Sequence, residues 1–448
     1  MNLTDIFLNE LLKLSDRNIP DNIIQTMKYC FIDYLGVTLA GSKLTVSKFD
    51  NLFKTIEKND ECQIIGTSIK TDPIYASFIN GISSHVIELD DGHRIGMVHP
   101  GSPVFSALLS IAEKYKLGHD DFWKGVLMGY EATVRLACAI QPGHKLKGYH
   151  ATSTCGSIGA ALGIAFALKY DFNQLKSTLS AAIASAGGIL EMIEGDSEMK
   201  PFNVGKAAQN GVMSAFFGKS SFTSPDDPLG GKRGFLKVMS DNPKIEYLTE
   251  FNIEKYMIET IYMKPYAACR HCHPSIEAAL KIRDKEGFEI EKIESIDVDT
   301  YKLAVEGHDH TEIKGMNSAK MSIPYSLAVA LFTGRANLNE YTEETILNRE
   351  IQNLTKKVYV TDIDELSNLC PGKRVAIVKI KANGKEFVER VDFPKGEPEN
   401  PLSRIELITK FRGLAKYGGL TDNTIDECIT RVLEYDFDAK KIMNLLGR

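Results

Sequence analysis

Apolar residues recur at helical spacing along almost the whole first half of the chain. From Leu3 to about Lys219 they return every three or four residues, which predicts a succession of helices. Residues 21–41 carry this pattern and stop at a glycine, a typical helix end. Residues 153–170 and 205–219 are rich in alanine and glycine and are apolar on more than one face. We therefore expect buried helices that pack closely on one another.

The pattern changes after about Lys255, where apolar and polar residues begin to alternate with a period of two. Asn383 and Gly384 separate two of the alternating runs, which is a strong hairpin signal. Helical segments lie between the runs, so this region is predicted to be a smaller α+β domain with a mainly antiparallel sheet. The alternating runs cover residues 293–301, 356–363, 374–384 and 385–393.

A chain of 448 residues exceeds the roughly 250–300 at which one core usually stops growing, so two domains are expected. The segment from residue 402 onward is helical again and is predicted to return to the first domain. The sequence thus predicts a mainly α protein. A large all-helical domain would span 1–255, completed by 397–448, and a smaller lid-like α+β domain with an antiparallel sheet would be inserted at 256–396.

Composition narrows the class of protein. The net charge of −6 argues against a nucleic-acid-binding protein. No apolar run reaches about 18 residues, so no membrane span is expected, and residues 1–16 lack the pattern of a signal peptide. The eight cysteines are mostly scattered singly, which favours reduced core thiols. We expect a cytoplasmic enzyme-sized protein.

One short loop concentrates titratable groups. The stretch ELDDGHRIGMVHPGSP, residues 88–103, could be an ordinary solvated turn, but two histidines in a glycine-rich setting indicate proton transfer or anion binding. Its titratable residues are Glu88, Asp90, Asp91, His93, Arg94 and His99.

Three further polar clusters lie at junctions between loops and predicted helices. Isolated lysines at such places are usually solvated, but several cations together indicate an anionic ligand. A small substrate with two or three carboxylates would satisfy them. The clusters contain Tyr149 and His150; Lys200 and Lys206; and Lys264, Arg270, His271 and His273.

Other interpretations of these motifs are weaker. GSIGAALG resembles a dinucleotide loop, but no strand precedes it, which favours packing of helices through small residues. CRHCH, residues 269–273, has cysteines and histidines too tightly spaced for a zinc site, so no metal is predicted. His85 and His119 are interpreted as core or cap residues. The sequence leaves open whether the loop at 307–310, with His308 and His310, faces a site.

Six blocks in this order resemble the MmgE/PrpD family over nearly the whole chain. They are ELDDGHR…HPG, GYHATSTCGSIGAA, KPFNVGKAAQNG, KPYAACRHCHPSIEA, AKMSIPYSLAVAL and GEPENPLSRIELITKF. The resemblance implies a homodimeric enzyme that acts on a small polycarboxylate without a redox cofactor or an iron–sulfur cluster. The family includes 2-methylcitrate dehydratase, cis-aconitate decarboxylase and iminodisuccinate epimerase.

Two departures from the family pattern leave the reaction open. Gly92 and His93 stand where dehydratases and decarboxylases tend to carry Thr-Trp, and Cys269 stands where decarboxylase-like members place a histidine. The sequence favours a lyase most similar to 2-methylcitrate dehydratase. Epimerisation of an imino- or amino-dicarboxylate and decarboxylation of cis-aconitate are the alternatives. Two further classes are metal-assisted hydrolysis, with Asp90, Asp91, His93 and His99 as ligands, and a non-catalytic carboxylate-binding protein.

The predicted mechanism is abstraction of a proton next to a substrate carboxylate. His99 and Asp91 are the predicted acid and base, and Asp90 is predicted to orient an imidazole. Lys200, Lys264 and Arg270 are predicted to stabilise the enolate-like transition state. The remaining predicted substrate-binding residues are His93, Arg94, Tyr149, His150, Lys206 and His273.

Overall fold

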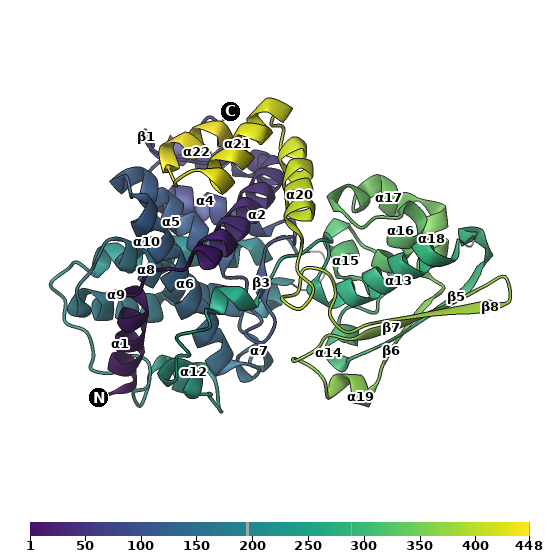
Figure 1. Cartoon of the computed structure of the whole chain (residues 1–448), viewed down its shortest axis with the longest axis horizontal. Coiled ribbons are helices and arrows are strands. Elements are labelled where there is room, and N and C mark those ends of the chain that lie inside the picture. The colour runs from purple at the N-terminus through teal and green to yellow at the C-terminus, as the bar shows by residue number, and fades with distance from the viewer. Residues whose placement is uncertain (194–196, 288, 448) are drawn as a thin grey trace. The chain divides into compact units, whose positions relative to one another are not determined.

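The computed structural model describes residues 1–193, 197–287 and 289–447, and it divides the chain into two compact units (Figure 1). The protein is mainly α-helical, as predicted. The helical unit comprises Met1–Met192, Met199–Tyr262 and Ser403–Arg448, and the α+β unit comprises Ile193–Glu198 and Met263–Leu402. The sequence analysis placed the corresponding boundaries after residues 255 and 396.

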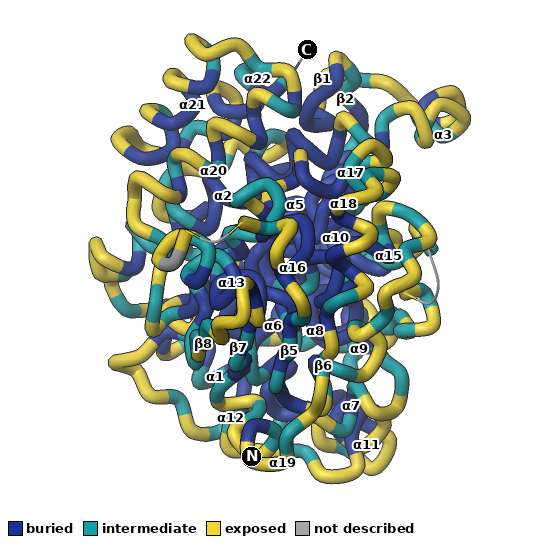
Figure 2. Tube along the Cα trace, turned by 90° about the vertical axis from the view of Figure 1, so that its right-hand side faces the viewer, coloured by how far each residue is buried: buried dark blue, intermediate teal, exposed yellow. Residues whose placement is uncertain are grey.

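The helical unit is built around long helices that are buried along most of their length. In Figure 2 the dark blue traces of α5, α8 and α10 mark this core. The core helices are α2 (Asp21–Thr45), α4 (Pro73–His85), α5 (Gly101–Tyr115), α6 (His119–Ile140), α8 (Ala151–Ala167), α9 (Phe172–Ser185) and α10 (Lys200–Phe217). Shorter or outer helices are α1 (Leu3–Ser15), α3 (Asp50–Thr55), α7 (Gly143–Leu146), α11 (Phe235–Met239) and α12 (Glu246–Thr249).

Glycines let α6 and α8 approach each other closely. A Cβ atom at Gly159 would lie 1.7 Å from Oγ1 of Thr133, and one at Gly163 would lie 2.7 Å from the carbonyl oxygen of Gly125. Only residues without side chains fit at this crossing. The interpretation of GSIGAALG as a helix-packing segment is therefore confirmed.

The C-terminal helices belong to the helical unit and pack on α2. They are α20 (Arg404–Tyr417), α21 (Asp422–Glu434) and α22 (Ala439–Leu446). Lys410 of α20 forms a 2.5 Å ion pair with buried Asp33 of α2. The same ammonium donates to the carbonyl oxygen of Leu89 at 2.9 Å. The last part of the chain thus anchors the loop that contains Asp90 and Asp91.

Two small antiparallel pairs interrupt the helical unit. β1 (Lys58–Gln63) pairs with β2 (Lys70–Thr71), and β3 (Gly92–His93) pairs with β4 (Ile261–Tyr262). The sequence analysis missed β1 because its residues, KNDECQ, are polar and mostly exposed and show no apolar alternation. In the described residues no helix combines the length and the apolar character that crossing a bilayer requires.

The α+β unit contains a four-stranded sheet in the order β6-β5-β7-β8. Its strands are β5 (Ile293–Thr300), β6 (Val358–Asp362), β7 (Ala376–Ala382) and β8 (Lys385–Val391). β7 pairs antiparallel with β5 and β8, but β6 runs parallel to β5. The sheet is thus mainly antiparallel, as predicted, with β6 as a parallel edge strand, because the helices between β5 and β6 form a crossover connection.

The predicted hairpin is confirmed. Asn383 and Gly384 both have positive φ, +54° and +69°, and connect β7 to β8 as the two-residue turn that this dipeptide favours. α13 contacts β7 and β8, and α16 contacts β6. The helices of this unit are α13 (His273–Glu286), α14 (Lys302–Val305), α15 (Met316–Met321), α16 (Ile323–Thr333), α17 (Glu343–Leu347), α18 (Arg349–Thr355) and α19 (Asp364–Ser367).

Candidate active site

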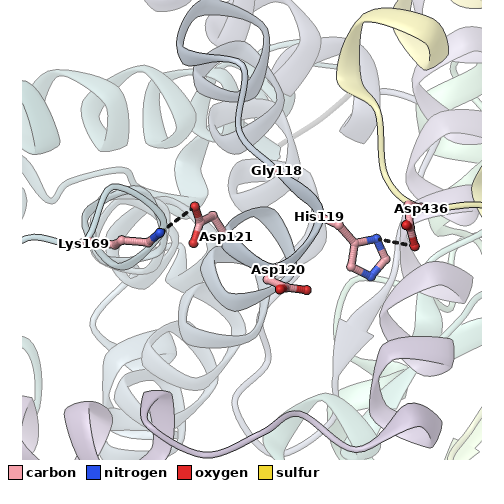
Figure 3. Close-up of a pocket in the computed structure, with 6 residues that line it drawn as sticks. All are labelled: Gly118, His119, Asp120, Asp121, Lys169 and Asp436. Carbon is pink, nitrogen blue, oxygen red and sulfur yellow. Dashed lines mark ion pairs between the residues drawn. The ribbon is translucent and has the colours of Figure 1, made fainter.

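A surface pocket beside the N-terminus of α6 collects charged residues but has little in common with the predicted site. Its side chains pair with one another: Lys169 with Asp121 at 2.9 Å, and His119 with Asp436 at 3.4 Å (Figure 3). The interpretation of His119 as a cap residue is not confirmed, because the N-cap of α6 is Gly118, and the His119 ring instead accepts a hydrogen bond from the backbone nitrogen of Phe437. The predicted acid and base residues, His99 and Asp91, lie elsewhere in the helical unit.

The loop between α4 and α5 forms the frame of the candidate site. α4 ends at His85 and α5 begins at Gly101, so the titratable stretch lies between two buried helices. Glu88 and Met97 adopt left-handed φ values of +58° and +48°. Such conformations are unfavourable for residues other than glycine and are concentrated at functional sites.

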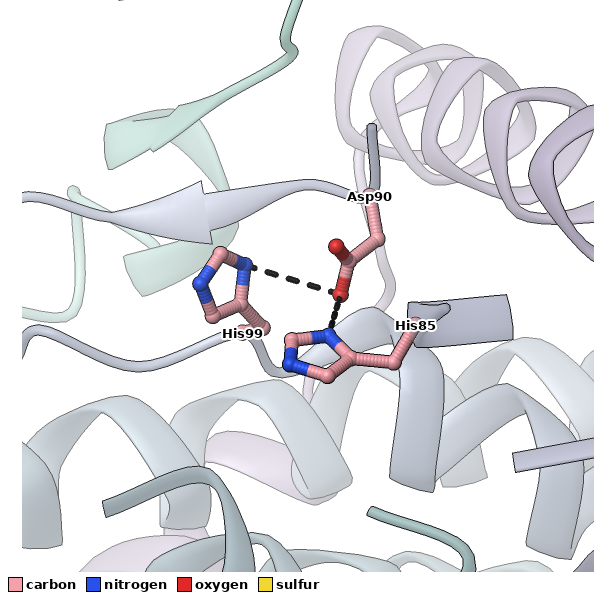
Figure 4. Close-up of side chains that lie close together, drawn as sticks. All are labelled: His85, Asp90 and His99. Atoms are coloured by element: carbon pink, nitrogen blue, oxygen red, sulfur yellow. Dashed lines mark hydrogen bonds and ion pairs between the residues drawn. The ribbon is translucent and has the colours of Figure 1, made fainter. Parts of the chain in front are cut away.

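Asp90 lies between two imidazole rings. Its Oδ2 atom is 2.7 Å from Nδ1 of His85 and 3.5 Å from Nδ1 of His99, and it also accepts a 2.9 Å hydrogen bond from Ser102 (Figure 4). The rings of His85 and His99 are 5.0 Å apart. Asp90 and His85 are almost completely buried, so this carboxylate acts on both imidazoles in a region shielded from water.

Hydrogen bonds fix the protonation of His99. Its Nδ1 atom lies 2.6 Å from the backbone carbonyl oxygen of Asp91, which can only accept, so Nδ1 carries the proton. The backbone nitrogen of His99 donates to Oγ1 of Thr152 and holds the residue in place. In the neutral ring Nε2 therefore has the lone pair. This is the tautomer that a general base needs.

Asp91 faces away from this pair of imidazoles. Its carboxylate accepts hydrogen bonds from the backbone nitrogen of Gly101 at 3.0 Å and from the hydroxyl of Tyr130 at 2.6 Å. Burial raises the pKa of Asp91 to about 7, and the charges of Asp90 and Asp33 act in the same direction, while the Tyr130 hydrogen bond opposes them. The backbone carbonyl oxygen of Asp91, not its carboxylate, therefore contacts and orients His99. For the carboxylate, the role of acid or base stays a prediction.

His150 completes a group of three histidines, of which His85 and His150 are buried and His99 is partly exposed. It precedes α8, and its ring centroid lies 5.9 Å from that of His85. Burial lowers the pKa of His150 well below its ordinary value, and nearby positive charges lower it further, so the ring stays neutral. Within the described residues, Nδ1 of His150 and Nε2 of His85 have no hydrogen-bond partner. Buried polar atoms are nearly always bonded, so these two nitrogens indicate a place for a polar ligand.

Lys200 is the first residue of α10 and forms an ion pair with Glu88. Both side chains are mostly buried, with 16% and 9% of their surface exposed. Lys206 lies on the same helix beside Gly187, where an added Cβ atom would be 3.3 Å from its Nζ atom. The loop thus contributes a counter-ion to the lysine that was predicted to bind substrate carboxylates.

His93, Arg94 and Tyr149 lie around the edge of this loop. Nδ1 of His93 accepts a hydrogen bond from the backbone of Gly96, so this imidazole stabilises the turn that contains half-buried Arg94. Tyr149 stacks on His144 with a centroid distance of 5.0 Å. His93 and Tyr149 therefore have structural contacts in the helical unit.

The predicted residues of the fourth cluster belong to the α+β unit. Arg270 donates to Glu397 and to the backbone carbonyl oxygens of Pro394 and Lys395, and its NH1 atom also donates to Nδ1 of His273. Nε2 of His273 donates to the carbonyl oxygen of Ala268. Lys264 is buried in the same unit. The contacts of Arg270 and His273 help to hold the fold of this unit, and their role in binding substrate stays a prediction.

One group of side chains in the described residues has donors close enough together for a metal ion, namely His85, Asp90 and His99, whose ligand atoms lie within 4.8 Å of one another. The hydrogen bonds argue against metal binding there. Nδ1 of His99 is protonated toward Asp91, and Nδ1 of His85 is bonded to Asp90, so a metal ion held through these Nδ1 atoms would displace both bonds. The alternative ligand set of the sequence analysis does not converge either, since Asp91 and His93 have other partners.

Sequence reasoning missed His85, Ser102, Tyr130 and Thr152. His85 ends a helix and bonds a residue five positions later in a loop of irregular conformation, which helical periodicity does not encode. Tyr130 lies in the middle of α6 and looks like an ordinary core residue. A usable signal for His85 was present, since it stands at the boundary between an apolar helix and the titratable stretch.

Comparison with known families gives two matches that together span most of the chain. The model of the MmgE/PrpD N-terminal domain matches residues 11–248, and that of the MmgE/PrpD C-terminal domain matches residues 266–434.

Proteins similar to this chain include cis-aconitate decarboxylases and a probable 2-methylcitrate dehydratase. The cis-aconitate decarboxylase of Aspergillus terreus is 25% identical over 97% of this chain and 94% of its own length. The human cis-aconitate decarboxylase is 23% identical over 92% of this chain and 88% of its own length. A probable 2-methylcitrate dehydratase of Saccharomyces cerevisiae is 23% identical over 77% of this chain and 71% of its own length.

Proposed function

This chain belongs to the MmgE/PrpD family and is an enzyme of the lyase type, and from that premise we propose that it removes a proton next to a carboxylate of a small polycarboxylate. The observation that carries the proposal is the bonding of His99. Its Nδ1 proton is held by the carbonyl oxygen of Asp91 beside the carboxylate of Asp90, so Nε2 is the proton acceptor.

The carboxylate of Asp90 supports this role in a second way. When His99 takes a proton it becomes positive, and a buried negative charge 3.5 Å from Nδ1 stabilises that imidazolium. His85 and Ser102 bond the same oxygen of Asp90 and hold it in position. Asp90 is therefore a positioning and electrostatic residue in the proposed mechanism.

Loss of the proton leaves negative charge on the substrate carboxylate, which becomes enolate-like. Lys200 supplies a cation, and the neutral ring of His150 and the ring of His85 supply polar nitrogens that have no other described partner. In a dehydration the electron pair of the broken C–H bond forms the C=C bond, and the hydroxyl group on the neighbouring carbon leaves with a proton as water. The product is an α,β-unsaturated polycarboxylate. None of these steps requires a cofactor.

We propose dehydration of a 2-methylcitrate-like acid as the specific reaction, because the neighbouring imidazoles of His85, His99 and His150 are enough for one base and one acid. Decarboxylation of a cis-aconitate-like acid is the second candidate, supported by the names of relatives that cover more than nine-tenths of this chain. Decarboxylation needs a proton donor for the new C–H bond but no base for the substrate.

The experiment is an NMR screen of the purified protein in D2O with citrate, 2-methylcitrate, cis-aconitate and an imino- or amino-dicarboxylate. Dehydration consumes the hydroxy acid and gives an alkene, which appears as a new vinyl proton signal or, where the proton leaves the methyl-bearing carbon of 2-methylcitrate, as an allylic methyl singlet. Decarboxylation gives a product with one carboxylate fewer, and epimerisation gives deuterium at carbon without a new compound. If every compound stays unchanged and undeuterated, the proposed carbon-acid chemistry is wrong.

A further inference from the structure

The α+β unit contains a cysteine and a histidine in direct contact. Sγ of Cys269 lies 3.2 Å from Nε2 of His308. Cys269 precedes the short helix η4 (Arg270–Cys272), and His308 follows α14, so two distant segments of the chain bring the pair together. Neither residue has a part in the proposed lyase mechanism.

The backbone holds His308 rigidly. Its nitrogen donates to the carbonyl oxygen of Val305 at 3.0 Å, and its carbonyl oxygen accepts from the nitrogen of Ile323 at 2.8 Å. Gly307 supplies the left-handed turn between them, with φ of +80°. The imidazole is therefore aimed at Cys269 by fixed main-chain geometry.

A second hydrogen bond determines which ring nitrogen is protonated. Nδ1 of His308 lies 2.9 Å from the carbonyl oxygen of Glu306, which only accepts, so Nδ1 carries the proton. In the neutral ring Nε2 then has its lone pair toward the thiol of Cys269. This is the arrangement in which an imidazole removes a thiol proton and stabilises the thiolate.

Cys269 is also accessible in a way that most cysteines of this chain are not. It is half-buried, as is Cys370, whereas the other six are buried. Burial raises the pKa of the neighbouring Cys272 thiol far above its ordinary value, although the positive charge of Lys264 opposes this. The positive charge of Lys264 therefore acts on Cys272, three positions from Cys269 in the chain.

We propose that Cys269 and His308 form a nucleophilic pair that adds to small α,β-unsaturated carboxylates. The thiolate sulfur forms a bond to the β-carbon, the electrons of the C=C bond move to the α-carbon, and the imidazolium of His308 returns its proton there. The result is a saturated thioether, and no oxidant or reductant is needed. The site takes conjugated carboxylates because the nucleophile is soft and a cation lies nearby.

The inference rests on the proposed function only for the origin of the ligand, since a dehydration would generate an acid of this class. The pair itself does not depend on turnover. Adding an unsaturated acid directly to the protein therefore tests the pair even if the proposed lyase reaction is wrong.

The first experiment measures alkylation of each cysteine by iodoacetamide, followed by peptide mass mapping. An ordinary thiol with a pKa of about 8.5 is roughly 1% ionised at pH 6.5, whereas a thiolate paired with an imidazolium is largely ionised. At pH 6.5 Cys269 should react at least about tenfold faster than Cys370, the other half-buried cysteine. Its rate should also change little between pH 6.5 and 8, while that of Cys370 rises.

Variants and a carboxylate probe complete the test. His308→Gln should lower the alkylation rate of Cys269 at pH 6.5 to about that of Cys370, and Cys370→Ser should leave the rate of Cys269 unchanged. Maleate should form a thioether on Cys269 of the wild-type protein, and the adduct should be lost in Cys269→Ser. Equal alkylation of Cys269 and Cys370 in the wild type, or no selective maleate adduct on Cys269, would overturn the proposal without bearing on the lyase reaction.

Discussion

Adjacent carboxylates in the same loop acquire different roles from their surroundings. Asp90 faces His85, His99 and the hydroxyl of Ser102, which hold it beside the proposed base. Asp91 faces Tyr130 and the first turn of α5, where burial raises its pKa to about 7. Its backbone carbonyl, not its carboxylate, acts on His99.

The raised pKa of Asp91 predicts a pH-dependent stability. Because the folded value of about 7 exceeds the ordinary value of 3.8, the folded protein binds this proton more tightly than the unfolded chain does. The contribution favours folding below about pH 4 and is lost as the pH rises toward 7. Relative to Asp91→Asn, the wild type should lose about 1.4 kcal/mol of unfolding free energy per pH unit within that window.

Urea denaturation of both proteins at pH 5, 6, 7 and 8 checks this prediction. Burial also raises the pKa of Glu113 to about 7, but Glu113 is present in both proteins, so the difference between them isolates Asp91. A difference in unfolding free energy that stays constant from pH 5 to 7 would contradict the assignment.

Lys200 should matter for both activity and stability. Lys200→Met removes a cation from the transition state, and such a contact is worth on the order of a hundredfold in turnover. It also leaves Glu88 buried without its counter-ion, which costs about 3–5 kcal/mol of unfolding free energy. Kinetics and thermal unfolding measure the two effects.

Glu88→Gln is the matched control for Lys200→Met, because it breaks the same ion pair but keeps the cation. We expect it to retain most of the activity, and we expect the double variant to recover part of the lost stability. Near-normal kinetics in Lys200→Met would remove Lys200 from the site.

The types and order of the site residues were readable from the sequence, but their partners were not. The concentration of acids and imidazoles at 88–99 correctly indicated the loop that contains Asp90 and His99. The inferred roles of Asp90 and Asp91 depended on side-chain direction in a loop with two left-handed residues, which no periodicity specifies. The ion pair of Arg270 with Glu397 was not readable from the sequence, because the two residues lie 127 positions apart in the chain.

At the scale of elements, the crossing of α4 and α10 fixes the distance between His85 and Lys200, which lie at the ends of these helices. Gly81 and Gly205 face each other there, and a Cβ atom at Gly81 would lie 2.9 Å from the Cα atom of Gly205. The two backbones are therefore in direct contact.

Gly205→Ala should disturb this crossing. Its new methyl group would lie 2.5 Å from the carbonyl oxygen of Phe78 and from Cγ1 of Ile82, so the helices must separate. Overpacking of this kind costs about 1–3 kcal/mol of unfolding free energy, and activity should fall because the start of α10 moves. Gly413→Ala is the control: it is also helical, but nothing lies within 4 Å of its added Cβ, so it should be neutral or stabilising by up to about 1 kcal/mol. Equal changes in both variants would contradict this explanation.

Elements with strong local patterns were predictable, and those defined by distant contacts were not. The buried helices and the hairpin at Asn383 follow from helical spacing and from a two-residue turn, both local properties. The parallel pairing of β6 with β5 depends on the path of more than fifty intervening residues. The anchoring of the site loop by Lys410 likewise joins positions that the sequence separates by 321 residues.

At the scale of the whole molecule, we propose a homodimer formed through the helical unit. α10 exposes an apolar strip made of Phe202, Met213 and Phe217, whose side chains are 43%, 51% and 43% exposed. Their spacing places them on one side of the helix, and Phe222 stacks on Phe217 at 5.1 Å. Contiguous exposed apolar residues of this kind are typical of subunit interfaces.

Light scattering at micromolar concentration should give about twice the chain mass of 49.7 kDa. The double variant Met213→Glu and Phe217→Glu should give a monomer. Ile405→Glu, which charges an apolar residue of α20 that is even more exposed, at 78%, should leave the dimer intact. A monomeric wild-type protein would exclude the proposed assembly.

The central claim is that Nε2 of His99 takes a proton from carbon, and solvent-deuterium exchange at the substrate carbon tests it most directly. The measurement compares the exchange rate in D2O for the wild type and for His99→Gln, each beside its thermal midpoint, with the compound found active in the NMR screen. The account predicts a loss of about 10²–10⁴-fold in exchange with little change in the midpoint, since a positioned proton-transfer group is worth that much. Exchange at the wild-type rate in a folded His99→Gln protein would show that another residue moves the proton.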